Sequence, residues 1–359
     1  MSSKKVVIWT SGIDNLINGE GLVGGLTVQM MHWANTFLKN DWEVISLTNN
    51  KTKNGLVLSN IIFKYLRKNA YLNIVFEPFI IFYFLYKNKP ELLISRGASR
   101  TQFALMLATK TLGVKLVLML ASDTDVLKGK ELIRHPWDRI LFRLGLRNTK
   151  YIIAQNSKQE DLVRSLRGNK NKVIVIPNVW PVKEIANTYK SNSILWVSNF
   201  RELKRPNWFL ELAKELPEYN FAMVGKSLDN KLFEQCKERA LKLPNVRFLG
   251  GLSFVETDGL FSQHKLFVCT SEIEGFPNTF LQAWANQVPV ITSFDPSDVV
   301  ENENLGITFE TIEEARLAIQ TILGDKAKYA DMQNAIKKYF KTAHHSQKQY
   351  ERLIGMTQE

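Results

Sequence analysis

Short apolar segments alternate with amphipathic helical segments along nearly the whole 359-residue chain, and this alternation restricts the fold more than any single motif. Strands of a parallel sheet are buried on both faces and are therefore short apolar runs, whereas the connecting helices repeat their apolar residues every three or four positions. The sequence therefore predicts an α/β protein built on parallel sheets.

The predicted elements form two successive series. The first series has strands at 6–10, 43–47, 92–95, 115–120 and 151–155, with helices at 27–39, 101–112 and 158–167. After a polar stretch, the second has strands at 194–197, 221–224, 246–249, 266–270 and 288–292. We predict two doubly wound Rossmann-like domains facing a central cleft, at 1–179 and 194–335, with a linker at 180–193.

The net charge of +12 is concentrated in the first half of the chain. Residues 1–180 hold 26 Lys and Arg against 12 Asp and Glu, a net of +14, whereas residues 181–359 hold 21 against 23, a net of −2. Such a field attracts nucleic acid, anionic lipid or phosphorylated ligands. No zinc finger, RNA-binding signature or basic-aromatic repeat favours nucleic acid, which we exclude as a partner.

Residues 60–89 combine basic residues with an aromatic-rich apolar run. The run 79–86 is unbroken, but Glu77 and Pro78 interrupt the segment, which is too short to span a bilayer. Two interpretations remain open: an interfacial element resting on an anionic membrane surface, or a helix packed into the core of the first domain with a solvated basic end.

Cysteine and histidine usage indicates neither disulfides nor a metal. Cys236 and Cys269 cannot form a disulfide framework and have no zinc-site spacing, and the N-terminus runs into a strand without a signal-peptide h-region. We therefore expect a cytoplasmic protein. The five histidines have no ligand spacing, and the pair His344-His345, in a polar tail, is expected to be solvated.

The most informative polar residue is Glu274, at the end of the loop after the predicted strand 266–270. The turn that follows consists of Gly275, Phe276, Pro277 and Asn278. A helix begins there, and backbone N–H groups at a helix N-terminus hold anions, while a carboxylate accepts hydrogen bonds from hydroxyls. A nucleotide-sugar carries both kinds of group.

Two other segments are candidates for phosphate contact. Gly24 and Gly25 open a helix, where backbone N–H groups meet no side-chain obstruction; the alternative is a flexible loop. Arg201, Lys204 and Arg205 occupy the loop after the first strand of the second series, where cations could clamp a diphosphate; the alternative is a solvated basic loop.

Asp123 and Asp125 follow an apolar strand of the first series. They are candidates for contact with acceptor hydroxyls or for proton transfer. Helix capping is the equally weighted alternative.

In order and spacing, these motifs resemble the family 4 glycosyltransferases of GT-B fold over nearly the whole chain. The motifs that carry the resemblance are Gly24-Gly25, Ile176-Pro177-Asn178-Val179, Lys204-Arg205-Pro206, Phe221 to Gly225, Asn245 to Gly250, and Glu274 to Asn278. The resemblance implies a first domain that faces the acceptor, a second that binds the nucleotide-sugar, and a C-terminal helix at 336–359 packing back on the first domain. It also implies retaining transfer of a sugar from a nucleotide-diphosphate donor, with no cofactor and no obligatory metal.

The resemblance also implies roles for individual residues. Arg201 and Lys204 would hold the donor diphosphate and offset the charge on the leaving group, and Glu274 would accept hydrogen bonds from the donor sugar. Backbone N–H groups from Phe276 to Asn278 would position sugar and phosphate, and residues from Leu249 to Phe254 would line the base pocket.

The chain departs from the family pattern at two positions. The second glutamate of the family, eight positions after the first, is replaced by Gln282, which would weaken the grip on the ribose hydroxyls by on the order of 1 kcal/mol. The sequence Val197-Ser198-Asn199 also lacks the arginine that many members have there, and Arg201 is assumed to replace it.

The basic first domain fits an acceptor such as a lipid-linked phosphate at the cytoplasmic leaflet. We therefore expect a membrane-associated enzyme that adds one sugar in capsule, lipopolysaccharide or exopolysaccharide assembly. Two alternatives remain: a non-catalytic partner subunit, favoured by Gln282, and a nucleotide-sugar epimerase on the same fold, disfavoured by the scarcity of histidines near the predicted strand ends.

Overall fold

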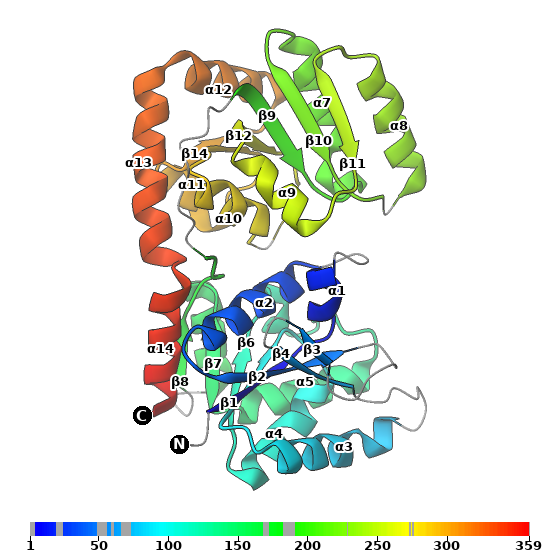
Figure 1. Cartoon of the computed structure of the whole chain (residues 1–359), viewed down its shortest axis with the longest axis vertical. Helices are drawn as coiled ribbons and strands as arrows, with labels where there is room; N and C mark the ends of the chain where they lie inside the picture. The colour runs from blue at the N-terminus through cyan, green and yellow to red at the C-terminus, as the bar shows by residue number, and fades with distance from the viewer. Residues whose placement is uncertain are drawn as a thin grey trace. The chain divides into compact units, whose positions relative to one another are not determined.

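The computed structural model describes residues 4–18, 24–48, 56–58, 61–65, 73–167, 172–181, 191–227, 229–272, 274 and 276–358. The chain divides into two compact units, drawn in Figure 1. The first comprises residues 1–179 together with 346–359, and the second comprises residues 180–345. Each unit is built on its own sheet.

The sheet of the first unit has eight strands in the order β3-β4-β2-β1-β5-β6-β7-β8, and only the pairing of β3 with β4 is antiparallel. The strands are β1 (Lys5–Trp9), β2 (Glu43–Thr48), β3 (Leu56–Leu58), β4 (Ile61–Tyr65), β5 (Leu92–Arg96), β6 (Lys115–Met119), β7 (Tyr151–Ala154) and β8 (Lys172–Val175). The helices are α1 (Ile13–Asn18), α2 (Gly25–Leu38), α3 (Asn73–Asn88), α4 (Thr101–Leu112), η1 (Asp123–Asp125), α5 (Pro136–Asn148), α6 (Ser157–Arg167) and α14 (Ser346–Gln358).

Helices cover both faces of this sheet (Figure 1). Successive strand residues point to opposite faces, so Val6 and Ile8 pack with α1, α2 and α14, whereas Val7 packs with α3 and α4. The helices α5 and α6 cover the strands β6 to β8 on the side of α3 and α4. Burial on both faces explains why the strands are continuous apolar runs.

The helix α14 belongs to the first unit although it follows the second in the chain. Leu353 and Met356 join the core formed by α2 and the sheet, and Trp42 Nε1 donates to the Tyr350 hydroxyl at 2.8 Å. Over 336–359, where the sequence predicts one helix, the structure has the end of α13 and the separate helix α14.

The sheet of the second unit has six parallel strands in the order β11-β10-β9-β12-β13-β14. The strands are β9 (Ser191–Val197), β10 (Asn220–Val224), β11 (Val246–Gly250), β12 (His264–Cys269), β13 (Val290–Thr292) and β14 (Gly306–Thr308). The helices are η3 (Glu202–Lys204), α7 (Pro206–Glu215), α8 (Asn230–Leu241), α9 (Phe254–Phe261), α10 (Asn278–Ala285), η4 (Pro296–Asp298), α11 (Val299–Asn302), α12 (Ile312–Gly324) and α13 (Lys326–Ala343).

The fold class is confirmed: each unit is a Rossmann-like α/β domain with helices on both faces of a parallel sheet. The ends of the predicted strands lie within three residues of the observed ends. The strands β3, β4 and β14 were missed.

Candidate functional site

The strand order of the second unit identifies where its ligand site should lie. Along the chain, the order runs outward from β9 through β10 to β11 and then returns to β12 on the other side of β9. Open α/β sheets bind ligands outside the carboxyl ends of the strands at such a reversal point. The loops that follow β9 and β12 therefore frame the candidate site.

These two loops bring Lys204 and Glu274 together although they are 70 positions apart. Lys204 Nζ forms an ion pair with Glu274 Oε1, and the Ser271 hydroxyl donates to the same carboxylate oxygen at 2.9 Å. The Lys204 and Glu274 side chains are 15% and 22% exposed, so both charges are partly shielded while remaining open to a ligand. The site thus presents a cation and an anion side by side.

Hydrogen bonds from β9 and β12 fix the backbone at Lys204. The Trp196 indole donates to Thr270 Oγ1 at 3.0 Å, and the Thr270 hydroxyl donates to the Lys204 carbonyl at 2.6 Å. The Glu272 N–H donates to the Leu203 carbonyl at 2.9 Å. These hydrogen bonds join the two loops, and sequence spacing alone gave no sign of the contribution of Thr270.

The other two cations of the basic loop differ from Lys204. Arg205 has a left-handed backbone (φ 46°), pairs with Glu272 at 3.4 Å and stacks its guanidinium over the Trp208 ring. Arg201 is exposed, and its side chain forms no ion pair within the described part of the chain. Arg201 is therefore the cation that remains available to a ligand without breaking an existing bond.

Close backbone contacts join the ends of β9, β10 and β11 at Gly225. Its N–H donates to the Gly250 carbonyl at 2.9 Å, and a Cβ at Gly225 would lie 1.7 Å from the Ser198 carbonyl oxygen. Gly250 itself has φ +64°. Leu249, predicted to line a base pocket, is half-buried in β11 beside this junction.

The predicted turn after Glu274 leads into α10. Pro277 precedes the helix and Asn278 is its first residue, while Gly275 lies outside the described residues. The Phe276 ring packs against Trp284 and His344, with centroids 6.1 and 5.4 Å away. The expectation that His344 is solvated is wrong: it is fully buried.

Gln282, the departure from the family pattern, faces a carboxylate. It is 4% exposed, and its Nε2 donates to Asp258 Oδ1 at 3.3 Å, which joins α10 to α9. The neutral amide of Gln282 is therefore matched to a neighbouring acid, where a glutamate would place two carboxylates in contact. Phe254, predicted to line the base pocket, lies at the start of α9 and packs on Trp180.

We expect the substitution Gln282→Glu to destabilise the protein increasingly as the pH rises. Two adjacent carboxylates raise the pKa of one of them, so the folded state binds the proton more tightly than the unfolded chain and loses stability above the unfolded pKa of about 4.3. Thermal unfolding should show a loss of about 1–3 kcal/mol near pH 8 and a smaller loss near pH 5. Gln263→Glu, at an exposed position, is the control; equal behaviour of the two variants would contradict the pairing with Asp258.

In the first unit the strand order reverses between β1 and β5. Gly24 caps α2 with an extended backbone (φ −78°, ψ 156°), and Gly25 is the first residue of that helix. The first turn of α2 lies beside the end of β5, because a Cβ at Gly97 would lie 3.2 Å from Leu26 Cδ1. The predicted glycine-led helix start therefore lies at this carboxyl edge.

Arg96, which the sequence analysis missed, ends β5 at the same edge. Its Nη2 donates to Asn178 Oδ1, while its buried Nε has no partner among the described residues. Burial lowers its pKa to about 10, and the nearby Asp125 opposes that shift. The sequence did offer a signal for Arg96, because an arginine stands there directly after the predicted buried strand 92–95.

The two predicted acids have different environments. Asp125 is buried and caps the turn η1, accepting backbone hydrogen bonds from Ala121 and Ser122; burial raises its pKa despite these bonds. Asp123 pairs with Lys158 at 3.2 Å and accepts from Gln159 at 2.9 Å. Burial opposes its ionisation, but these bonds outweigh burial and lower the pKa.

The described residues contain no cluster of three or more His, Cys, Asp or Glu side chains arranged to hold a metal ion. None of their helices combines the length and the apolarity that crossing a bilayer requires.

Comparison with known proteins relates the second unit to one enzyme family. Residues 178–339 match the family model described as "Glycosyl transferases group 1". A 175-residue segment is 23% identical to the O-antigen biosynthesis glycosyltransferase WbnH of Escherichia coli, covering 48% of this chain and 46% of that protein. The aligned part thus spans about half the length of this curated relative.

Solved structures share the fold over the whole chain. Sucrose-phosphate synthase from Thermosynechococcus elongatus superimposes with a TM-score of 0.75 at 15% identity, covering 98% of both chains. HepE from Anabaena, solved in complex with UDP, superimposes with a TM-score of 0.74 at 14% identity, covering 98% of this chain and 99% of that one. At such identities the likeness establishes the two-domain fold.

Proposed function

We propose that the protein transfers a hexose from a nucleotide-diphosphate sugar to a glycan or lipid-linked acceptor, with retention of configuration. Residues 178–339 match the family model described as "Glycosyl transferases group 1", which supports the proposal. The observation that carries the proposal is the Lys204–Glu274 ion pair beside the reversal point of the second sheet. A donor sugar has a diphosphate to bind the cation and hydroxyls to bind the carboxylate. The O-antigen role of WbnH favours cell-surface polysaccharide as the product.

In the proposed reaction, Lys204 and Arg201 bind the diphosphate and stabilise the negative charge that develops on it. Glu274 accepts hydrogen bonds from the sugar hydroxyls, and the N-terminus of α10 contributes its N–H groups. The bond between the anomeric carbon and the leaving phosphate oxygen breaks, and the acceptor oxygen bonds to that carbon on the same face. The acceptor proton passes to the leaving phosphate oxygen, so neither a metal nor a histidine base is required.

The acceptor side of the proposal rests on the first unit. Arg96 and the first turn of α2 lie at its reversal point, where an anionic or hydroxyl-rich acceptor would bind. An acceptor anchored in lipid would require a cytoplasmic enzyme to reach the inner face of the membrane as a peripheral protein. Asp123 contributes to acceptor binding only if the acceptor displaces Lys158 or Gln159 from its carboxylate.

The two alternatives lose support at the level of single residues. Gln282 favoured a non-catalytic partner subunit, but its amide is matched to Asp258 and need not reflect loss of a site. An epimerase would need accessible histidines near the strand ends, but His32, His264 and His344 are buried, which leaves the exposed His135 at the start of α5 and the partly buried His345.

Nucleotide binding tests the proposal, with Glu274→Gln as the decisive variant. UDP, GDP, ADP and CMP are compared by thermal shift, and a nucleoside diphosphate at one hundred times its Kd should stabilise the wild type by about 2.7 kcal/mol. Glu274→Gln releases Lys204 from its ion pair, so nucleotide affinity should be kept or increased while sugar transfer falls about 100-fold.

Glu272→Gln is the matched control, because this exposed neighbour pairs with Arg205 rather than Lys204. If no nucleotide shifts the wild type, the donor-site proposal fails. If Glu274→Gln abolishes nucleotide binding itself, the division of roles between Lys204 and Glu274 is wrong.

A further inference from the structure

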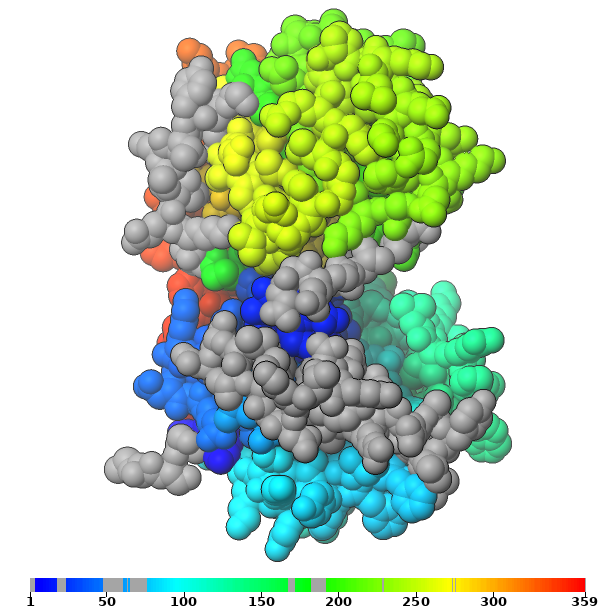
Figure 2. Space-filling model, turned by 45° about the vertical axis from the view of Figure 1, so that its right-hand side comes forward, coloured from blue at the N-terminus to red at the C-terminus, as the bar shows by residue number. Residues whose placement is uncertain are grey.

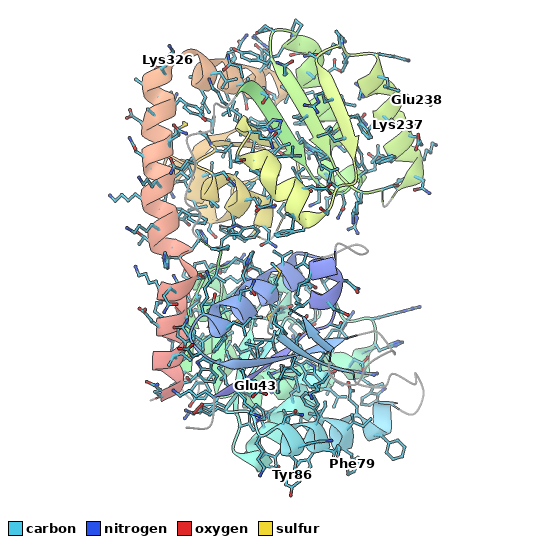
Figure 3. The ribbon with its side chains drawn as sticks, in the orientation of Figure 1. Glu43, Phe79, Tyr86, Lys237, Glu238 and Lys326 are labelled. Carbon is cyan, nitrogen blue, oxygen red and sulfur yellow. The ribbon has the colours of Figure 1, made fainter. Side chains whose placement is uncertain are left out.

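The outer face of α3 is lined with aromatic side chains that the first unit leaves uncovered. Phe76, Phe79, Tyr83 and Tyr86 are all exposed, Phe79 by 71%, and their spacing of three, four and three residues places them on one stripe. Figure 3 shows Phe79 and Tyr86 projecting away from the ribbon, and Figure 2 shows α3 (light blue) at the surface.

The opposite face of α3 is fixed to the unit. Ile81, Phe84 and Leu85 are buried in the core between α3, α4 and the sheet, and Glu77 accepts a hydrogen bond from Thr101 at 2.8 Å. One face of α3 therefore packs in the core, as the second interpretation of residues 60–89 expects, and the other face is held outward on the helix.

The neighbouring helices extend the apolar surface. α5 exposes Trp137, Ile140 and Leu144 at helical spacing, and α4, which packs between α3 and α5, exposes Leu107. Ten of the fifteen exposed large apolar side chains of the described residues lie between 76 and 144, so the surface is a concentrated patch rather than ordinary scatter. We call it the apolar face of α3–α5.

Positive charge surrounds this face. The exposed cations on its helices and the adjoining loops include Lys87, Lys89, Lys110, Arg134 and Arg147. The exposed acid over described residues 76–147 is Glu91. A second copy of the chain would bring like charges together across an isologous interface, whereas lipid phosphates would neutralise them.

We propose that the apolar face of α3–α5 docks on the surface of an anionic phospholipid bilayer. The aromatic rings enter the headgroup region, which tyrosine and tryptophan favour, and the cations contact lipid phosphates. This inference rests on the proposed function only for its purpose, which is to bring the enzyme to a lipid-linked acceptor. The docking itself needs neither donor nor acceptor.

Vesicle co-sedimentation tests the inference on the full chain without substrates. Wild type should bind vesicles of phosphatidylcholine with phosphatidylglycerol, should bind pure phosphatidylcholine much more weakly, and should be released by salt. The double variant Phe79→Ser/Tyr86→Ser should bind at least ~10-fold more weakly, and Lys110→Ala ~5-fold more weakly. These positions are exposed, so the variants should unfold at the wild-type temperature.

The matched control is Leu241→Ser/Val255→Ser, which removes two apolar side chains that are each 77% exposed in the second unit. Control binding equal to wild type, with loss in the α3 variant, supports the inference. Equal binding by wild type and the α3 variant, or no binding to anionic vesicles at all, overturns it. A wild-type dimer that the α3 variant dissociates would assign the face to a second copy instead. Nucleotide binding should be unchanged in every variant, so failure here stays separate from failure of the donor site.

Discussion

Replacing Lys204 by alanine should lower nucleoside-diphosphate affinity by about 10- to 100-fold, since a hydrogen bond to a charged group contributes about 1.5–3 kcal/mol. Turnover of a sugar donor should fall further, by about 100- to 1000-fold, because the cation also stabilises charge that develops on the leaving group. The substitution keeps the Lys204 carbonyl that Thr270 binds, so the loop should keep its position. Isothermal titration and initial-rate measurements would give the two numbers.

Lys214→Ala provides the matched control for Lys204→Ala. Lys214 lies in α7, close in sequence, and is 66% exposed beside Glu211. Both variants remove one positive charge, so a general electrostatic effect would weaken binding equally in both. Normal nucleotide binding by the Lys204 variant would place the diphosphate elsewhere, with the exposed Arg201 as the next candidate.

The substitution Gly225→Ala should destabilise the second unit by at least about 3 kcal/mol, or about 6–12 °C in Tm. The added Cβ would lie 1.7 Å from the Ser198 carbonyl oxygen and 3.1 Å from the Phe200 ring. A carbonyl in a strand-end hydrogen-bond network cannot turn aside as a flexible side chain can. The ends of β9 and β10 must separate, which also displaces the loop that carries Lys204.

Gly259→Ala is the opposite case within the same unit. Gly259 lies in α9, and a Cβ there meets nothing within 4 Å. Alanine favours the helix by about 0.5–1 kcal/mol over glycine, so this variant should be neutral or slightly stabilised. Urea unfolding of both variants measures the contrast; a Gly225 variant as stable as wild type would mean that the strand ends can separate freely.

The fold can be predicted from the sequence because strands buried on both faces of a parallel sheet consist of consecutive apolar residues. The sequence also identifies Lys204 and Glu274 as residues that follow strands, but it does not show that they touch. That contact depends on β9 and β12 being neighbours, which is a property of the sheet order rather than of either loop. In the same way, Gln282 looked from the sequence like the loss of a family glutamate. The fold shows that α9 places Asp258 within hydrogen-bond distance of its amide.

The burial of His344 shows a signal that was present and overlooked. The polar composition of α13 suggested a solvated tail, but Met332, Ile336 and Phe340 are buried and His344 follows at the same spacing of four residues. Three apolar positions on one stripe identify the packed side of a largely polar helix. The overall composition of α13 is dominated by the residues on its exposed faces and therefore hides the apolar stripe.

The placement of α14 in the first unit sets the order in which the protein can be assembled during translation. Domains generally fold as they emerge, but Leu353 and Met356 of the first unit's core are made only after residues 180–345. At ordinary synthesis rates that interval lasts roughly 10–30 s. Throughout it, the side of α2 that packs against α14 is without Leu353 and Met356, so the nascent first unit is the stage at which a chaperone would be needed most.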